Sequence, residues 1–167
     1  GGNPSSIDGL LGVDGEASLY FLNPNGVMFG PESSLDIMGS FVVSTAEGFK
    51  FEDGSEFRSV ATGDESRLTV SVPLGVQVGL EQRDGSIISS EGSLFAGQDL
   101  TLFSDEVNLQ GEVISGGNLS LLGTTVRSRD SVTVPFIAVA RGELLVQGNE
   151  SVDIVTLSHP ESGFYSG

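Results

Sequence analysis

The chain has 167 residues, 38% of them hydrophobic, so it is long enough to bury the core of one domain and too apolar to be disordered. Its 23 acidic and 7 basic residues give a formal charge of −16, which excludes nucleic acid and anionic membranes as direct partners because both would repel it. Cysteine is absent, which excludes a disulfide framework, a thiolate metal site and a cysteine nucleophile.

Residues 1–18 predict a loop-rich start in which four apolar residues between glycines act as anchors. These anchors are Ile7, Leu10, Leu11 and Val13. The opening run Gly1-Gly2-Asn3-Pro4 is typical of the interior of a chain. No apolar run approaches the ~18 residues that a membrane helix requires.

A four-residue turn follows, Asn23-Pro24-Asn25-Gly26, flanked by the predicted strands 19–22 and 27–29. Asn23 suits position i of a type I turn, Pro24 suits i+1 and Gly26 suits i+3. Pro24 presets its own φ, and the Asn23 side chain can bond the backbone two residues further on. The sequence therefore predicts a rigid turn at this point.

Strands 35–37 and 41–45 come next, and residues 46–66 are more polar and broken. Within them, 49–51 and 56–58 predict short strand pieces of a hairpin or flap outside the regular core. The run 68–72 then alternates between apolar and polar residues, which is typical of a strand with one face buried. We find no run with a convincing helical period.

From Gly85 the pattern repeats. The predicted strands are 86–89, 93–96, 100–103, 107–109, 113–115 and 119–122. Aligning 98–102 on 117–121 gives a period of about 19–20 residues, which is typical of a solenoid. Three short strands per period favour a parallel β-helix over a leucine-rich repeat. We expect an all-β, right-handed parallel β-helix (solenoid) with a short extrahelical hairpin or loop region.

The last third continues this pattern. The predicted strands are 125–128, 132–134, 136–140, 144–146 and 152–155. Two turns are predicted between them, one at Asp130-Ser131 and one at Gln147-Gly148-Asn149.

Asn-Pro-Asn-Gly, the following Phe29-Gly30-Pro31, and the run 35–42 together resemble the haemagglutination-activity domain. This is the N-terminal secretion domain of filamentous-haemagglutinin-like exoproteins, which are exported by two-partner secretion. The runs 125–131, 135–138, 144–149 and 152–154 resemble later coils of the cyanobacterial branch. The resemblance is strong at 16–45, fair at 84–122 and 124–167, and poor at 46–72.

The resemblance implies a non-enzymatic secretion domain without a cofactor. An outer-membrane β-barrel transporter would recognise it on the way from the periplasm to the cell surface or medium. The resemblance implies a role in secretion for Asn23, Pro24, Asn25 and Gly26. The alternative is that this turn only stabilises the fold. Any host or cell-surface ligand would be bound by the full-length adhesin.

We expect residues 1–167 to form a single β-helix domain fragment, truncated at both ends and lacking a signal peptide and the first coils. Residues 1–79 would be the secretion-domain part, and residues 80–167 the following coils. A third reading makes the chain a structural spacer in an adhesin stalk.

The alternative function is a carbohydrate-active or carbohydrate-binding β-helix. Glycoside hydrolysis requires two facing carboxyl groups. The candidates on spacing alone are Asp36, Asp99, Asp105, Glu112, Asp130 and Asp153. No acidic pair joined by a basic group is visible within a turn, and we expect these residues to be turn caps or solvated. The chain has no Trp to stack on sugars, and its one histidine, His159, cannot form a metal site alone.

Overall fold

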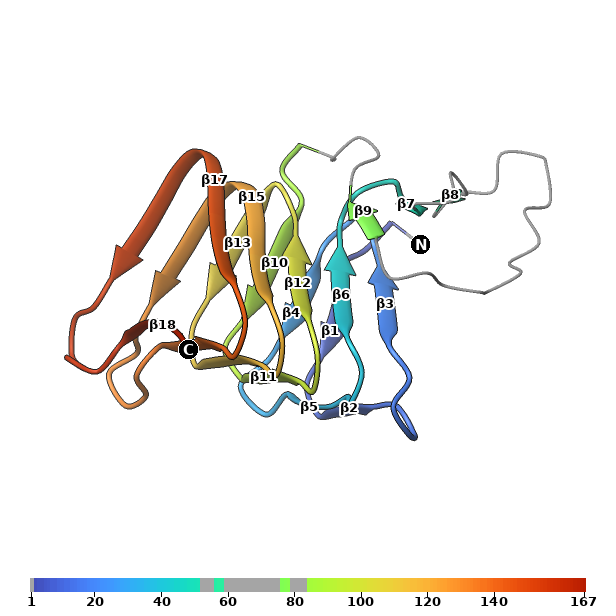
Figure 1. Ribbon diagram of the computed structural model, residues 1–167. Coiled ribbons are helices and arrows are strands. Elements are labelled where there is room, and N and C mark those ends of the chain that lie inside the picture. Colours follow the sequence, from blue (N-terminus) through green and yellow to red (C-terminus); the bar gives the residue numbers. More distant parts are fainter. Residues whose placement is uncertain (1, 52–55, 59–75, 79–83) are drawn as a thin grey trace.

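The computed structural model describes residues 2–51, 56–58, 76–78 and 84–167, and every regular element in these ranges is a β-strand (Figure 1). Within the same ranges, no helix is long and apolar enough to span a membrane. The strands are mostly short because Gly, Pro, Asn and Ser interrupt the apolar runs every few residues. The all-β class expected from the sequence is confirmed.

Two large sheets, parallel throughout, contain most of these strands. The six-stranded sheet has the order β18-β16-β14-β11-β5-β2. Its members are β2 (Leu10–Gly12), β5 (Ser34–Asp36), β11 (Ser93–Ala96), β14 (Glu112–Ser115), β16 (Ile137–Ala140) and β18 (Gly163–Ser166). The nine-stranded sheet has the order β1-β4-β10-β13-β15-β12-β6-β3, with β17 paired to β15. Its members are β1 (Ser5–Ile7), β3 (Leu19–Leu22), β4 (Val27–Phe29), β6 (Phe41–Ser44), β10 (Ile87–Ser90), β12 (Leu100–Phe103), β13 (Glu106–Leu109), β15 (Leu119–Arg129) and β17 (Leu144–Val155).

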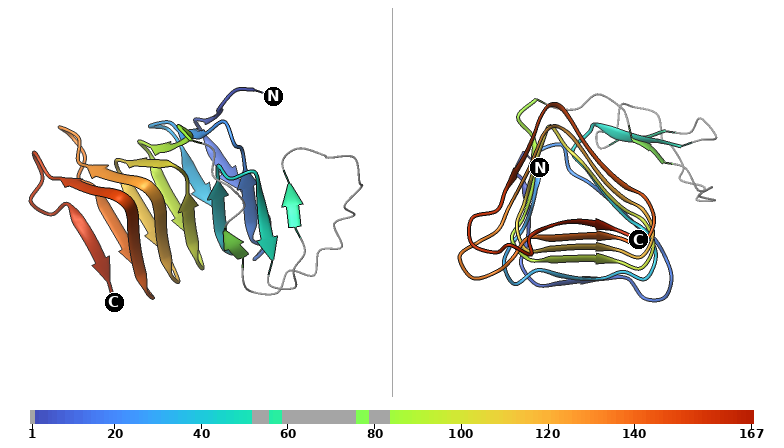
Figure 2. Two further views of the ribbon diagram at one scale, coloured as in Figure 1. Left: turned by 90° about the horizontal axis from the view of Figure 1, so that it is seen from above. Right: turned by 60° about the vertical axis from the view of Figure 1, so that its left-hand side comes forward.

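The nine-stranded sheet bends around a corner within its two longest strands. The first half of β15 pairs with β12, where Leu100 lies opposite Leu119, and its second half pairs with β13. β17 follows β15 on both sides of this corner. Seen along the stack, successive turns of the chain superpose as a triangle (Figure 2). Each turn of chain thus contributes to three faces.

The spacing between neighbouring turns is regular in the middle of the stack and wider later. Asp99 and Asn118, which occupy equivalent corners, are 19 residues apart. The next corner contact, from Asn118 to Glu143, spans 25 residues. The predicted period of about 19–20 residues is therefore confirmed for the middle turns. The later turns are longer because loops lead into β16 and β18.

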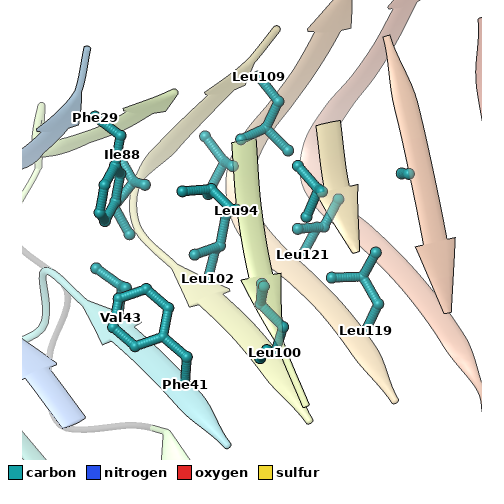
Figure 3. Packing of buried hydrophobic residues seen from close by; sticks show 14 of the residues in the cluster. Phe29, Phe41, Val43, Ile88, Leu94, Leu100, Leu102, Leu109, Leu119 and Leu121 are labelled. Atoms are coloured by element: carbon teal, nitrogen blue, oxygen red, sulfur yellow. The ribbon is translucent and has the colours of Figure 1, made fainter. Parts of the chain in front are cut away.

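Alternate residues of each strand point into the stack and form one continuous apolar core. Figure 3 shows Leu100 and Leu119 from neighbouring turns packed side by side, with Leu102 and Leu121 in the next row. Phe29 and Phe41 meet edge to face with ring centroids 6.2 Å apart. Burial of each such leucine contributes about 1.5–3 kcal/mol. The stacking of like residues on like therefore favours the register in which Leu100 lies opposite Leu119 and Leu102 lies opposite Leu121.

One corner of the stack carries a ladder of side-chain oxygens, which we call the corner ladder. In each rung, the side chain of one turn accepts a hydrogen bond from the backbone N–H of the equivalent residue one turn later. The accepting residues are Ser18, Ser40, Asp99 and Asn118, and the bonds measure 3.0, 3.3, 2.7 and 2.8 Å. The ladder satisfies backbone donors at a point where the chain leaves its strands.

A small antiparallel sheet lies outside the parallel stack. Its order is β8-β7-β9, formed by β7 (Gly48–Phe51), β8 (Glu56–Arg58) and β9 (Val76–Val78). The extrahelical hairpin expected from the sequence is confirmed by β7 and β8. Phe49 of β7 meets Tyr20 edge to face at 6.0 Å, and burial raises the pKa of Tyr20. Val42 is 6% exposed although it points away from the core of Phe41 and Val43.

Several local expectations need correction. Residues 1–18 contain two strands, and Leu10 is 71% exposed because it lies on the outer side of β2, so it is no anchor. Ile7, Leu11 and Val13 do pack against the core. Residues 132–134 form no strand, and Val132 is 86% exposed. The predicted turn at 147–149 lies inside β17, and the predicted strand 68–72 falls outside the described residues.

Candidate functional site

The Asn-Pro-Asn-Gly turn joins β3 to β4 at a corner of the stack. The Gly26 N–H donates to the Asn23 carbonyl oxygen at 3.0 Å, which closes the turn. The Asn25 N–H donates to Asn23 Oδ1 at 3.0 Å, and the Asn25 side-chain amide donates to the same oxygen at 3.1 Å. The turn geometry predicted from the sequence, including the bond from Asn23 to the backbone two residues on, is confirmed.

Asn23 also joins its own turn of chain to the turns on either side. Its Nδ2 donates to Ser5 Oγ at 2.8 Å and to the Asn3 carbonyl oxygen at 3.2 Å, both in the preceding turn. Its backbone N–H donates to the Ser44 carbonyl oxygen at 3.1 Å in a later turn. The amide orientation is fixed because the Asn25 N–H can only donate and the Asn3 carbonyl can only accept.

Gly26 is required by both conformation and space. Its φ of 110° lies in the region that side-chain-bearing residues avoid. A Cβ at this position would lie 2.8 Å from the Ile87 carbonyl oxygen. The Gly26 carbonyl in turn accepts a hydrogen bond from the Ser5 N–H at 3.0 Å. The end of the turn is thus enclosed by the strands β1 and β10 that pair with β4.

Two apolar side chains lie on the outer surface of the strands next to the turn. Met28 of β4 is 43% exposed and Ile87 of β10 is 38% exposed. β4 and β10 are paired neighbours, with Val27 opposite Ile88. Asn23, Pro24 and Asn25 are themselves half-buried. The turn therefore presents a partly polar surface beside two exposed apolar groups.

A buried hydroxyl cluster connects the two ends of the segment that leaves the stack, and sequence reasoning missed it. Thr45 Oγ1 lies 2.7 Å from Ser86 Oγ and donates to Ser104 Oγ at 2.9 Å. Ser104 Oγ in turn donates to the Ser86 carbonyl at 3.0 Å. All three residues are less than 5% exposed. Only the register between distant turns brings them together, so no local sequence signal could have found them.

The acidic residues considered for catalysis lie on different turns and corners, and the structure does not bring them together. Asp99 is a rung of the corner ladder, and Asp105 Oδ2 accepts from the Gly85 N–H at 2.7 Å. Asp36 and Glu112 lie on separate strands of the six-stranded sheet. The expectation that these residues serve as caps is confirmed for Asp99 and Asp105.

Asp130 is the most completely bonded of these carboxylates. It is 3% exposed and accepts three backbone hydrogen bonds, from Leu157, Ser158 and His159, each at 2.7 Å. The bond from Leu157, helped by the other two, outweighs burial and holds the pKa of Asp130 below its ordinary value. Asp130 thus fixes the loop that leads from β17 to β18.

An ion-pair ladder on the outer face of β13, β15 and β17 was not anticipated. Arg127 pairs with Glu106 through Nη1 and with Asp153 through Nε at 3.4 Å. The spacing in the sequence hides this arrangement because the three residues belong to three turns. Arg127 and Asp153 line a surface cavity of about 600 Å³, whose lining also includes Asn108 and Arg129 and contains no aromatic residue.

His159 lies in the loop between β17 and β18. Its Nδ1 is 3.3 Å from Glu161 Oε1, and its backbone is held by Asp130. Among the described residues, no group of three His, Cys, Asp or Glu side chains is placed to hold a metal ion.

A family model described as the TPS secretion domain matches residues 1–166. No curated protein and no solved structure matches the chain significantly. The matched range includes the Asn-Pro-Asn-Gly turn and both parallel sheets.

Proposed function

The chain belongs to the TPS secretion-domain family, that of the two-partner secretion exoproteins, and on this basis we propose how its structure serves export. Membership gives the chain the role of a secretion domain in a haemagglutinin-type exoprotein. Such proteins reach the cell surface or the extracellular space through a partner transporter. The proposal concerns which residues the partner reads and how the chain folds after export.

We propose that the outer-membrane β-barrel transporter recognises the turn at Asn23, Pro24, Asn25 and Gly26. The observation that carries this proposal is that the turn is closed by bonds among its own residues. A chain crossing the envelope unfolded offers few fixed shapes, and a turn with its own hydrogen bonds is one of them. The exposed Met28 is the second residue after the turn and would add apolar contact area.

The architecture that we propose for the exported domain is a right-handed parallel β-helix. The parallel pairing, the 19-residue spacing and the three faces per turn support it. Each completed turn presents a row of unpaired backbone groups to the next segment, so folding would proceed turn by turn outside the cell. Completion of one turn would template the next.

Residues 1–79 and 80–167 would then act as successive parts of one domain, the first bearing the recognition turn. Pairing of β4 with β10 joins the two parts.

Adhesion remains a proposal for the full-length exoprotein. A carbohydrate-active role receives little support, since Glu106 and Asp153 both pair with Arg127 and the cavity beside them lacks aromatic lining. We propose no enzymatic activity.

The test measures secretion of the parent exoprotein carrying Asn23→Ala or Asn25→Ala, with and without its transporter, beside thermal unfolding of the purified domain. Lost secretion with unchanged unfolding is the expected result for Asn25→Ala, because the substitution removes a side-chain bond within the turn and leaves the bond from the Asn25 N–H to Asn23 Oδ1 in place. For Asn25→Ala, lost secretion in step with lowered stability would mean that the turn acts through folding alone. Secretion that needs no transporter would contradict the proposal.

A further inference from the structure

The side-chain amide of Asn23 is divided between two sets of partners. Its oxygen accepts only from Asn25, two residues away. Its nitrogen donates to the Asn3 carbonyl and to Ser5 Oγ, which are 20 and 18 residues away. One amide group therefore closes the local turn with one atom and fastens that turn to the preceding turn of chain with the other.

The hydrogen bonds that close the turn need no other part of the molecule. The bonds from Gly26 N–H to the Asn23 carbonyl and from Asn25 to Asn23 Oδ1 lie within four residues. Pro24 restricts φ before any folding takes place. A turn of this kind can form in a chain that has no tertiary structure.

The hydrogen bonds from Asn23 Nδ2 to the preceding turn of chain exist only when the two turns are packed against each other. Besides the two Asn23 Nδ2 bonds, the Ser5 N–H donates to the Gly26 carbonyl at 3.0 Å. Ser5 therefore contacts both ends of the turn, with its hydroxyl at Asn23 and its backbone at Gly26.

We propose that Asn23 has two separable roles and that Ser5 is a positioning residue for one of them. The inference rests on the proposed function of the turn. The Oδ1-closed turn is what the transporter reads in the unfolded chain. After export, the bonds from Asn23 Nδ2 to Ser5 and Asn3 lock the turn against β1 and fix the register of the first turns.

Two substitutions separate the roles. Ser5→Ala removes the hydroxyl partner of Nδ2 and leaves the turn itself intact. Asn23→Asp keeps an acceptor oxygen for Asn25 but places a second oxygen against the Asn3 carbonyl, where no hydrogen bond is available. Aspartate is as suitable as asparagine at the first position of a type I turn. Asn23→Ala removes both the side-chain bonds within the turn and the side-chain bonds to the preceding turn of chain.

The experiment measures transporter-dependent secretion of the parent exoprotein and the Tm of the purified 167-residue chain for each variant. We expect Ser5→Ala and Asn23→Asp to be secreted as well as their controls, with Tm lowered by about 2–4 °C. We expect Asn23→Ala to lose secretion and Tm together. The matched controls are Ser6→Ala, at the exposed neighbouring residue, and Asn149→Asp, which adds the same charge far from the turn.

Three results would overturn the inference. Secretion of Ser5→Ala falling as far as that of Asn23→Ala would show that the transporter reads the assembled contact. An unchanged Tm for Ser5→Ala would remove its locking role. Normal secretion of Asn23→Ala would instead remove the proposed function of the turn, and this outcome is distinct because it does not depend on Ser5.

Discussion

The hydroxyl groups of Thr45 and Ser86 lie 2.7 Å apart, although 41 residues separate them in the sequence. Thr45 directly follows β6, the last strand before the chain leaves the stack, and Ser86 directly precedes β10, the first strand after its return. Ser104, one turn later, hydrogen-bonds to both residues. The stack is therefore continuous across the segment that leaves it, and a buried polar contact marks the junction.

We expect Thr45→Val to destabilise the domain by about 1–3 kcal/mol, because it leaves the buried hydroxyls of Ser86 and Ser104 short of a partner. The measurement is the free energy of unfolding in denaturant. Thr133→Val is the control, since Thr133 is exposed and hydrogen-bonds to Ser131 through its backbone N–H, which the substitution keeps. Equal effects of the two substitutions would contradict a special role for the cluster.

Gly26→Ala should destabilise the domain more than Gly15→Ala does. Both glycines have positive φ, 110° and 78°, so both substitutions carry a conformational cost, about 1–2 kcal/mol for an ordinary left-handed residue. Only Gly26 adds a steric contact, 2.8 Å from a new Cβ to the Ile87 carbonyl, whereas nothing lies within 4 Å at Gly15. Thermal unfolding of the two variants isolates the contribution of this contact, and a Gly15→Ala variant as unstable as Gly26→Ala would disprove it.

Stability should fall at acidic pH through Asp130. The pKa of Asp130 is lower in the folded state than its ordinary value, so its contribution to stability is fully present above that ordinary value. The contribution is lost as the pH falls further, through the folded pKa. We expect the Asp130→Asn variant to be less stable than the native chain at pH 7 and to lose less stability on acidification. Parallel pH profiles for the two proteins would contradict this assignment.

Arg127→Gln should lower stability by less than about 1 kcal/mol, because Arg127 and Asp153 are both about half exposed and solvent screens their attraction. The loss should shrink further at high salt. Arg141→Gln removes the same charge at an exposed position outside the ladder and serves as the control. A large, salt-independent loss would mean that Arg127 acts through packing.

Where glycine and polar residues mark the corners, the sequence predicts the bounds of the strands closely. Strands 93–96 and 100–103 have the predicted bounds, because glycine, Gln98 and Asp99 separate two alternating apolar runs. β15 and β17 are longer than predicted, because each passes through a corner without leaving the sheet. The residues Gln147-Gly148-Asn149 have turn composition, yet pairing with β15 holds them in a strand.

At the candidate site, too, the sequence predicts local conformation but not contacts between distant residues. Residues 23–26 could be predicted as a turn because Asn, Pro and Gly each have a local conformational preference. The contacts with Ser5, Ser44 and Ile87 could not, because they depend on which turns become neighbours. The segment between Thr45 and Ser86 hides that neighbourhood by interrupting the repeat. The pairing of Glu106 and Asp153 with Arg127 could not be predicted either, because the three residues belong to three different turns.

The corner ladder bears on how such a chain can change over evolutionary time. Each rung joins a side-chain oxygen to a backbone N–H one turn later, and Ser, Asp and Asn are interchangeable as acceptors. Duplication or loss of the 19 residues between Asp99 and Asn118 would therefore leave every remaining rung with a suitable partner. An insertion of another length would have to loop out at a corner, as the segment after Thr45 does. Gene rearrangements by whole turns are thus the changes in length that this domain tolerates best.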